Sequence, residues 1–513
     1  MAGHSILRNA FTVGAFTSLS RLLGLVREMM QSRLIGADIE QSAFTLAFAI
    51  PNMARKLFGE GALTAAFVPV FKGAVETGSK EKAAALARAV MTTVLLMLAA
   101  IVLLAFGGLE TVVKFRAELG ITDNRRFLLT VRLVKTLLPY MIFICGAAFG
   151  MGVLNALGRF RASSFMPCLL NIVWIGMLAW IAIFPDLRPD QRIHRIAMAI
   201  LVAGAVQFAF MLFAMHRAGV HPGITFSGWR DTAVVKVWKN LGVAALGAGA
   251  IQLNYMLDQI LAQLASPWAA GVIGYAERLM DLPLGVIGVA FGTVLLPSFA
   301  GLFARNDMDG ARKALGDSVN SLLFIMVPAA VGLGVLAYET TGVIYQGGEF
   351  DATATTRVGR ALAMYAAGLG FFGFQKILIP WFQSQNDMKT PLKVSVATVC
   401  LNAVLNILAV WLLPVEWRHV GLAASTVLCS MVGCAMLLIA AKRKNGELGL
   451  SRCLGPLARI LAASGAMAAA LVTARRFLHV NPAVDLAVLV TLGGAVYFAV
   501  AIPLTRGKIR LRR

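Results

Sequence analysis

Two apolar stretches that carry several charges decide the fold: SRLLGLVRE at residues 20–28 and AFAIPNMARKLFGEGALTAAFVP at residues 47–69. Both are apolar enough for the interior of a bilayer, where a charged side chain is costly unless it faces protein or water. The charges in them are Arg21, Arg27, Glu28, Arg55, Lys56 and Glu60. Because cations recur on two adjacent predicted helices, Arg21, Arg27 and Arg55 indicate a water-filled, positively charged cavity.

The spacing within the first stretch limits which of its side chains can line one cavity. Arg21, Gly24 and Glu28 fall on one face of a helix. Arg27 lies six residues from Arg21, about 120° round an ideal helix. A straight helix separates the two arginines, whereas a local bend at Gly24 would allow both to line one cavity. For Lys56 and Glu60, the alternative is that their side chains reach the headgroups.

The composition excludes a soluble multi-domain protein. Of the 513 residues, 58% are hydrophobic and only 14% are charged, which is typical of an integral membrane protein. The net charge of +22 is compatible with nucleic-acid binding, but the basic residues lie mostly between apolar segments, where anionic lipid is the nearer partner. The six cysteines and six histidines show no metal-binding spacing, so we expect neither a metal site nor a disulfide.

Apolar runs of about 20 residues or more predict fourteen membrane spans. They are 6–30, 40–71, 84–108, 128–157, 162–184, 195–215, 238–264, 269–303, 314–338, 353–384, 391–413, 420–441, 456–478 and 483–505. The first is interpreted as a retained span rather than a cleaved signal peptide. Lys and Arg are about twice as frequent on the side of the N-terminus, which predicts that both termini are cytoplasmic.

A weak internal repeat predicts two similar lobes. The run ALTAAFVPVF (62–71) resembles AFGTVLLPSF (290–299), and one offset in numbering separates both Pro69 from Pro297 and Arg132 from Arg360. Since each copy holds an even number of spans, the two lobes would be related by an axis along the membrane normal. The predicted domains are an N-lobe (1–217, spans 1–6), a C-lobe (236–441, spans 7–12) and a C-terminal helix pair (456–505, spans 13 and 14).

The second lobe contributes a polar set of its own. In YAERLMDLP (275–283), Glu277 and Asp281 lie one turn apart and Arg278 can pair with Asp281 within the helix. A self-neutralised cluster near a helix end is the alternative to a functional one. Asp258 and Lys376 each lie alone in an apolar span, so Asp258 is expected to be paired, ion-binding or hydrated.

No motif predicts an enzyme. GLGFFG (368–373) satisfies a dinucleotide-binding pattern, but it lies inside an apolar span without a preceding strand, so we interpret its glycines as helix-packing residues. The chain has no Walker sequence, no Ser/His/Asp arrangement and no paired carboxylates in a polar loop, which argues against an ATP-driven pump.

Several motifs together resemble the MurJ family of lipid II flippases, in the multidrug/oligosaccharidyl-lipid/polysaccharide exporter superfamily. They are SRLLGLVRE, IPNMARKLFGEGALTAAFVP (50–69), LGRF (157–160), YAERLMDLP, GVIGVAFGTVLLPSFA (285–300) and NDMKTP (386–391). The resemblance implies an all-α membrane protein of fourteen helices, in which two six-helix lobes related by pseudo-two-fold symmetry surround a cationic cavity. It also implies that a final helix pair forms a groove for a lipid tail.

The function implied is translocation of undecaprenyl-diphosphate bearing a disaccharide-pentapeptide, from the cytoplasmic to the periplasmic leaflet of the bacterial inner membrane. Planar arginine forks suit the diphosphate, because they replace its hydration with charge-assisted hydrogen bonds. The family's cavity arginines match Arg21, Arg27, Arg55 and Arg278. Residues expected to support the cavity or a gate are Gly24, Glu28, Asn52, Glu60, Glu277 and Asp281.

One position departs from the family pattern, and the energy source stays open. Ser42 stands where an acid is often found before AF at the start of span 2. Asp258 matches an acid of a sodium site found in some members, but Lys376 makes a lysine-occupied or ion-free site equally compatible. The membrane potential and a coupling ion, Na+, H+ or Cl−, are the alternatives, and no cofactor is expected.

The expected partners are lipid II and membrane lipids, with no nucleic acid. We expect a monomer, with cell-wall synthesis proteins as candidate partners. The alternative function is export of another substrate, such as a polyprenyl-linked polysaccharide, or drug/cation antiport, which would use acids rather than arginines in the first lobe.

Overall fold

The computed structural model describes residues 2–57, 62–77, 80–119, 125–184, 186–292, 294–478 and 480–505. Within these ranges the regular elements are helices, apart from an isolated β-bridge between Gly347 and Phe350. Ten of the helices described are long and apolar enough to cross a bilayer. The all-α, multi-pass membrane class predicted from the composition is confirmed.

Each of the ten helices overlaps one predicted span. Phe160–Ile183 and Lys389–Leu412, for example, match the predicted spans 162–184 and 391–413 to within two residues. The four predicted spans outside this set are 6–30, 40–71, 238–264 and 269–303. They carry every charged candidate residue except Lys376, which lies on Ala352–Gln383, and the count of fourteen spans stays a prediction.

The chain divides into two compact units, Met1–Gln263 with Gly347–Phe350, and Leu264–Gln346 with Asp351–Arg513. Most of the helix Thr232–Ala265 groups with the first unit, whereas the predicted boundary places it in the C-lobe. The symmetry of two six-helix lobes and the three predicted domains stay predictions.

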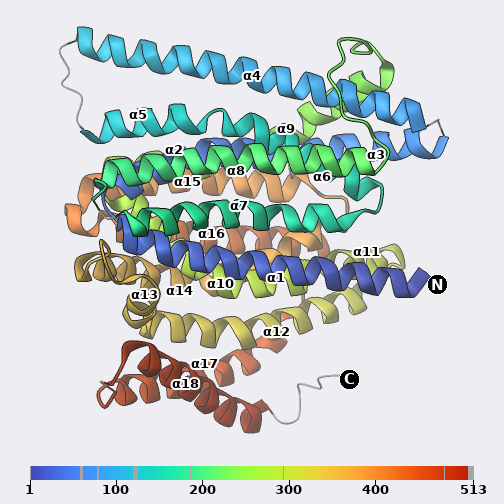
Figure 1. Cartoon of the computed structure of the whole chain (residues 1–513). Coiled ribbons are helices and arrows are strands. Elements are labelled where there is room, and N and C mark those ends of the chain that lie inside the picture. Colours follow the sequence, from blue (N-terminus) through green and yellow to red (C-terminus); the bar gives the residue numbers. More distant parts are fainter. Residues whose placement is uncertain are drawn as a thin grey trace. The chain divides into compact units, whose positions relative to one another are not determined.

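The first unit contains nine helices in the described ranges (Figure 1). They are α1 (Ala2–Ile35), α2 (Ile39–Ala54), α3 (Ala62–Thr77), α4 (Lys80–Glu118), α5 (Arg125–Leu137), α6 (Tyr140–Ala156), α7 (Phe160–Ile183), α8 (Pro189–Arg217) and α9 (Thr232–Ala265). Helix α1 packs along α7, α7 along α8, and α6 along α8.

Glycines allow α6 and α8 to approach closely. A Cβ on Gly204 of α8 would lie 2.4 Å from the Tyr140 ring, and one on Gly146 of α6 would lie 2.6 Å from the Phe208 ring. Small residues are the usual means of close helix packing in membranes. Apolar side chains there meet lipid as favourably as they meet another helix, so hydrophobicity does not drive the helices together. At these two points a glycine on one helix faces an aromatic ring on the other.

The second unit contains the other nine α-helices described. They are α10 (Ala269–Gly292), α11 (Leu295–Ala304), α12 (Met308–Val335), α13 (Ala337–Tyr345), α14 (Ala352–Gln383), α15 (Lys389–Leu412), α16 (Arg418–Asn445), α17 (Leu454–Ala474) and α18 (Pro482–Thr505). Two 3-10 helices, η2 (Val415–Trp417) and η3 (Leu450–Cys453), precede α16 and α17.

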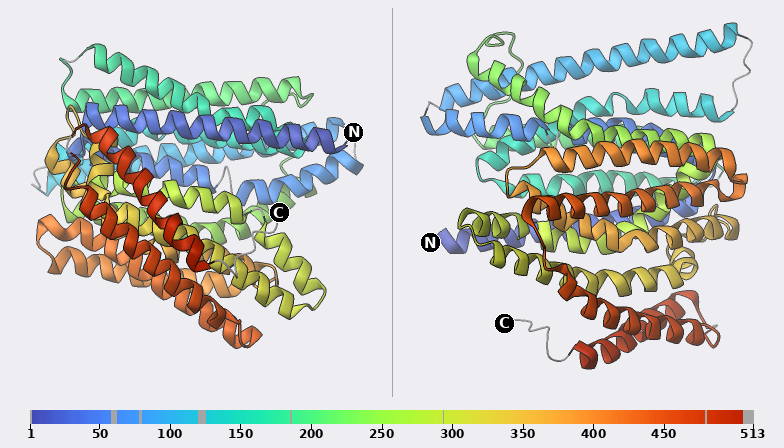
Figure 2. Two further views of the ribbon diagram at one scale, coloured as in Figure 1. Left: turned by 90° about the horizontal axis from the view of Figure 1, so that it is seen from below. Right: turned by 180° about the vertical axis from the view of Figure 1, so that it is seen from behind.

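Helix α14 is central to the second unit, since it packs against α10, α12 and α16. Helices α17 and α18 form a hairpin, which Figures 1 and 2 show in red. The hairpin packs on α12, where Tyr497 donates a 2.7 Å hydrogen bond to the Phe324 carbonyl. The C-terminal helix pair is thus fastened to the second unit through α12.

Three helices continue past a glycine or a proline. Helix α1 runs without interruption from Ala2 to Ile35, past Gly24, and α10 runs past Pro283 to Gly292. Helix α2 also continues past Pro51 and ends at Ala54, where residues 55–57 form one π-type turn. Helix α1 is therefore unbroken at Gly24, and a bend there that would bring Arg21 and Arg27 to one cavity stays one of the two alternatives.

Candidate functional site

Arg27 is a buried cation in the middle of unit one, with only 8% of its surface exposed. Its Nη1 donates a 3.0 Å hydrogen bond to Oδ1 of Asn171 on α7, and its Nη2 forms an ion pair with Glu28. A buried guanidinium is tolerated only where its charge and its donors are met in this way. The packing of α1 on α7 supplies Asn171, and the next residue of α1 itself supplies Glu28.

Trp174, one turn after Asn171 on α7, forms an aromatic face for the same guanidinium. The Arg27 Cζ lies 4.3 Å from the centroid of the indole, within the range of a cation–π interaction. The indole is itself fixed by edge contacts with Phe44 and Phe48 of α2, at centroid distances of 5.6 and 5.7 Å. Three helices thus converge on Arg27.

Asn171 also binds the backbone of α1. Its Nδ2 donates a 3.0 Å hydrogen bond to the Ser20 carbonyl. Gly24 lies beside this amide, since a Cβ on Gly24 would be 3.9 Å from Asn171 Nδ2. Gly24 therefore lies at the contact between α1 and α7.

The other first-unit candidates that the structure describes lie on α1 and at the end of α2. Arg21 is exposed on α1. Arg55 is half-buried, and its Nε and Nη2 donate hydrogen bonds of 3.1 and 3.0 Å to the Asn52 carboxamide oxygen. Lys56 lies with its Nζ 5.1 Å from the centroid of the Tyr255 ring on α9. Glu60 lies outside the described residues.

Ser42, the position that departs from the family pattern, is fully buried at the start of α2. Its carbonyl oxygen accepts a hydrogen bond from the Gln263 carboxamide at the end of α9. Beside it, Gln31 Nε2 donates a 2.9 Å hydrogen bond to Gln41 Oε1. Carboxamides therefore lie close to this position, and the buried Glu40, two residues earlier, pairs with Arg125.

The second-unit candidates lie on α10. Glu277 is half-buried and accepts a 3.3 Å hydrogen bond from the Tyr365 hydroxyl of α14. Arg278 and Asp281 are exposed on the same helix. Because Arg278 belongs to the second unit and the other three arginines to the first, their convergence on one cavity stays a prediction.

The two charges predicted for an ion site also belong to different units. Asp258 on α9 accepts a 3.3 Å hydrogen bond from Asn254, one turn earlier, while Lys376 is exposed on α14. A pair between them stays a prediction. In the part of the chain that the structure describes, no three side chains of His, Cys, Asp or Glu are grouped to hold a metal ion.

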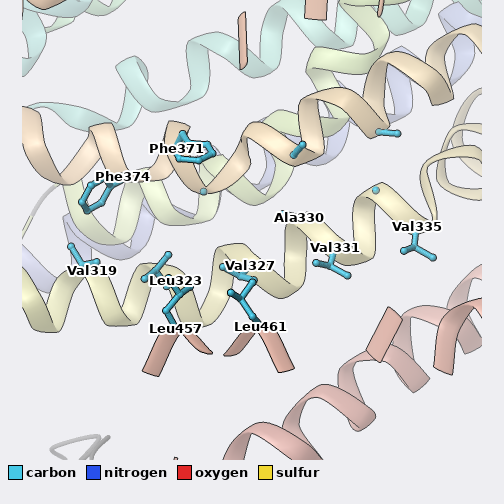
Figure 3. A pocket seen from close by; sticks show the side chains of 14 residues that line it. Val319, Leu323, Val327, Ala330, Val331, Val335, Phe371, Phe374, Leu457 and Leu461 are labelled. Atoms are coloured by element: carbon cyan, nitrogen blue, oxygen red, sulfur yellow. The ribbon is translucent and has the colours of Figure 1, made fainter. Parts of the chain in front are cut away.

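An apolar cavity of about 680 Å³ lies in the second unit, between α12, α14 and α17 (Figure 3). Its size is within the roughly 300–1,000 Å³ typical of ligand pockets. Figure 3 shows Phe371 and Phe374 on α14 and Leu457 and Leu461 on α17, with α12 between them. Every residue of its wall is aliphatic, aromatic or glycine, so the cavity suits a hydrocarbon chain.

Sequence reasoning missed the residues that hold the candidate charges. Asn171 and Trp174 are 5% and 3% exposed and lie in a span that was predicted only as apolar. The available signal was a carboxamide in the middle of the run LLNIVWIG (169–176), since buried polar groups in a membrane are hydrogen-bonded. Tyr365, which binds Glu277, gave no comparable signal.

Comparison with known proteins identifies similar chains over nearly the full length. The family model described as "Lipid II flippase MurJ" matches residues 31–490. A Rhizobium meliloti protein named "Probable lipid II flippase MurJ" is 32% identical over 512 residues, which cover 97% of this chain and 94% of the relative.

Solved structures show the same fold. "Lipid II flippase MurJ, inward closed conformation" superposes with a TM-score of 0.78 at 21% identity, over 97% of this chain and 99% of that one. An inward-facing multidrug resistance MATE family transporter of the MOP superfamily gives a TM-score of 0.66 at 14% identity, over 84% and 95%.

Proposed function

Because the chain belongs to the MurJ family of lipid II flippases, in the multidrug/oligosaccharidyl-lipid/polysaccharide exporter superfamily, we propose that it carries lipid II across the bacterial inner membrane. The cargo is undecaprenyl-diphosphate bearing a disaccharide-pentapeptide. It would move from the cytoplasmic to the periplasmic leaflet by alternating access, without covalent chemistry.

The observation that carries the proposal is the buried guanidinium of Arg27. A diphosphate that leaves the water around the lipid headgroups loses its hydration, and positively charged hydrogen-bond donors must replace it. Arg27 is fixed between Asn171 and Trp174 on a helix that also carries Arg21, and Arg55 follows on the next helix. A drug/cation antiporter would instead be expected to use acids in these positions.

In this proposal the four arginines share the headgroup. Arg21, Arg27 and Arg55 bind the diphosphate and sugar from the first unit, and Arg278 binds from the second. Glu28, Asn52 and Glu277 orient the basic groups or hydrogen-bond the sugar, and Gly24, Glu60 and Asp281 support the cavity or a gate. The contacts of Asn52 with Arg55 and of Glu28 with Arg27 support these roles.

The polyprenyl tail would stay in lipid or in the apolar surface of the second unit. The cavity between α12, α14 and α17 supports this role, because it is lined only by apolar side chains and glycines. Burying hydrocarbon there is neutral against lipid, so the tail would be guided along the protein and not tightly held.

Resetting the empty carrier requires an energy source, for which we propose the membrane potential. Each elementary charge moved across 100 mV is worth about 2.3 kcal/mol, and the empty cavity would carry net positive charge. A coupling ion at Asp258 and Lys376 is the alternative. We further propose that the carrier is a monomer with both termini in the cytoplasm.

Depletion with complementation tests the proposal. Cells lacking the protein should accumulate lipid II in the inner leaflet, and the Arg27→Ala variant should be produced at normal levels without rescuing growth. Arg443→Ala is the matched control, because Arg443 is exposed at the end of α16. Rescue by Arg27→Ala at normal levels would remove the proposed role of this residue.

A further inference from the structure

The oxygen and the nitrogen of the Asn171 carboxamide each have a hydrogen-bond partner, and the two atoms could not exchange these partners. Its oxygen must face Arg27, because a guanidinium has donors and no acceptor. Its nitrogen must face the Ser20 carbonyl, which can only accept. The chemistry of the two partners therefore fixes the amide orientation. One side chain of α7 thus binds both the backbone of α1 and the charge that α1 carries.

Trp174 is the second side chain of α7 that restricts the guanidinium of Arg27. Asn171 and Trp174 are three residues apart, so both side chains project from one face of α7 toward α1. Arg27 Nη1 donates its hydrogen bond to Asn171 Oδ1, and the guanidinium Cζ lies 4.3 Å from the centroid of the indole. Since Phe44 and Phe48 hold the indole from α2, it cannot move aside freely.

We infer that Asn171 and Trp174 are positioning residues, which hold the Arg27 guanidinium ready for the diphosphate of the cargo. This inference rests on the proposed function and goes beyond it, because it assigns roles to two residues that touch Arg27. An arginine side chain loses much conformational freedom on binding an anion. A side chain already held in one orientation loses less, and this preorganisation favours binding.

The chain offers a matched control for a merely structural role. Gln207 on α8 is 1% exposed, and its Nε2 donates a 2.9 Å hydrogen bond to the Met166 carbonyl of α7. It is a buried carboxamide that binds a helix backbone, as Asn171 does, but it contacts no arginine in the described structure. Replacing it should lower stability without changing anion binding.

The experiment measures the binding of two probes to the full chain in nanodiscs. Undecaprenyl diphosphate carries the tail and the anion, and undecaprenol carries the tail alone, so the ratio of their affinities reports the diphosphate contribution. The variants are Asn171→Ala, Arg27→Ala, the double variant, Gln207→Ala, Trp174→Leu and Trp174→Phe. If Asn171→Ala does not fold, Asn171→Ser replaces it, since its side chain is too short to reach Arg27.

We expect Asn171→Ala to lower the ratio roughly tenfold or more, the usual range for a lost hydrogen bond to a charged group. In the Arg27→Ala background it should cause no further loss, because a positioning residue acts through its target. Trp174→Leu should lower the ratio, and Trp174→Phe should restore part of it. Gln207→Ala should leave the ratio unchanged.

Three results would overturn the inference. One is a ratio that Asn171→Ala leaves unchanged while Arg27→Ala loses the diphosphate contribution. That result would leave the proposed function intact. Another is an additive loss in the double variant, which would mean that Asn171 acts independently of Arg27. The third is an unchanged ratio in Arg27→Ala itself, and this result alone also removes the proposed role of Arg27.

Discussion

Arg192 Nη1 on α8 lies 2.8 Å from Glu349 Oε1 and 3.1 Å from the Leu34 carbonyl at the end of α1. The Glu349 amide also donates a 2.9 Å hydrogen bond to the Arg33 carbonyl. The Gly347–Phe350 turn connects α13 to α14, yet it belongs to the compact unit that contains α1 and α8. The turn is therefore fastened to the first unit while its two flanking helices belong to the second.

Replacing Gly348 with Ala should loosen this turn. A Cβ on Gly348 would lie 2.3 Å from the Arg33 carbonyl oxygen, and the residue has φ of +56°. The combined clash and left-handed backbone should lower the free energy of unfolding by about 1–3 kcal/mol. A lower Tm of the purified protein in detergent would report the loss.

The control for this substitution is Gly14→Ala in α1, where an added Cβ has no atom within 4 Å. Alanine is favoured over glycine in a helix, so this variant should keep or slightly raise the Tm. Equal Tm values for the two variants would show that the turn does not need the fit between Gly348 and Arg33.

Arg27→Lys should fail to replace arginine even though it keeps the charge. A lysine ammonium has no planar fork, so it cannot bind Asn171 and Glu28 while it lies flat on Trp174. Losing one such charged hydrogen bond should reduce transport by about tenfold or more. The measurement is inner-leaflet lipid II in depleted cells that express each variant.

Arg443→Lys is the matched control, because Arg443 is exposed at the end of α16 and either cation can remain hydrated there. It should support normal growth. If Arg27→Lys were as active as the wild type, a point charge would suffice and the fork geometry would be irrelevant.

The cost of burying charge in a bilayer directs attention to Arg27 from the sequence alone. Its partners could not be predicted in the same way, because Asn171 and Trp174 follow about 145 residues later, on a helix whose pairing with α1 has no local signature. Apolar run length predicts where the apolar helices lie, whereas helix pairing depends on side-chain fit across the whole unit.

Glycine and proline predict the shape of these helices poorly. Gly24 would permit a bend in α1, yet the helix is continuous there and the glycine lies beside the Asn171 amide. Pro51 likewise leaves α2 intact to Ala54. In a membrane helix a lost backbone hydrogen bond is compensated by neighbouring groups, so glycine and proline are weak signals of a break there.

Asp387 should stabilise the loop before α15 down to low pH. Its Oδ1 accepts from the Thr390 amide at 3.0 Å, and its Oδ2 accepts from Lys444 Nζ at 3.0 Å. The backbone hydrogen bond from Thr390, aided by Lys444, lowers the pKa of Asp387 from 3.8 to about 2. Because the pKa is lower in the folded state, the stabilisation is present above pH 3.8 and is lost as the pH falls toward 2.

Asp387→Ala should therefore lower the free energy of unfolding by about 1 kcal/mol at neutral pH, as for loss of a helix cap. The difference in Tm from the wild type should stay constant from pH 8 to 5 and decrease below pH 4. Asp309→Ala is the control, since its side chain is 95% exposed and its pairing with Arg312 should contribute little. A Tm difference that grew as the pH fell would contradict the assignment.

Gly370→Phe should fill the apolar cavity of the second unit without disturbing the helices around it. Gly370 lies on α14 in the wall of the cavity, and an added Cβ would have no atom within 4 Å. A phenyl ring there would occupy space that a polyprenyl chain needs, so crosslinking of a photoactivatable undecaprenyl probe to α12 and α17 should decrease.

Gly465→Phe on α17, where a Cβ also has no atom within 4 Å, is the control because Gly465 does not line this cavity. If both variants crosslink like the wild type, the tail follows a path outside the cavity, and the arginines would have to retain the cargo through its headgroup alone.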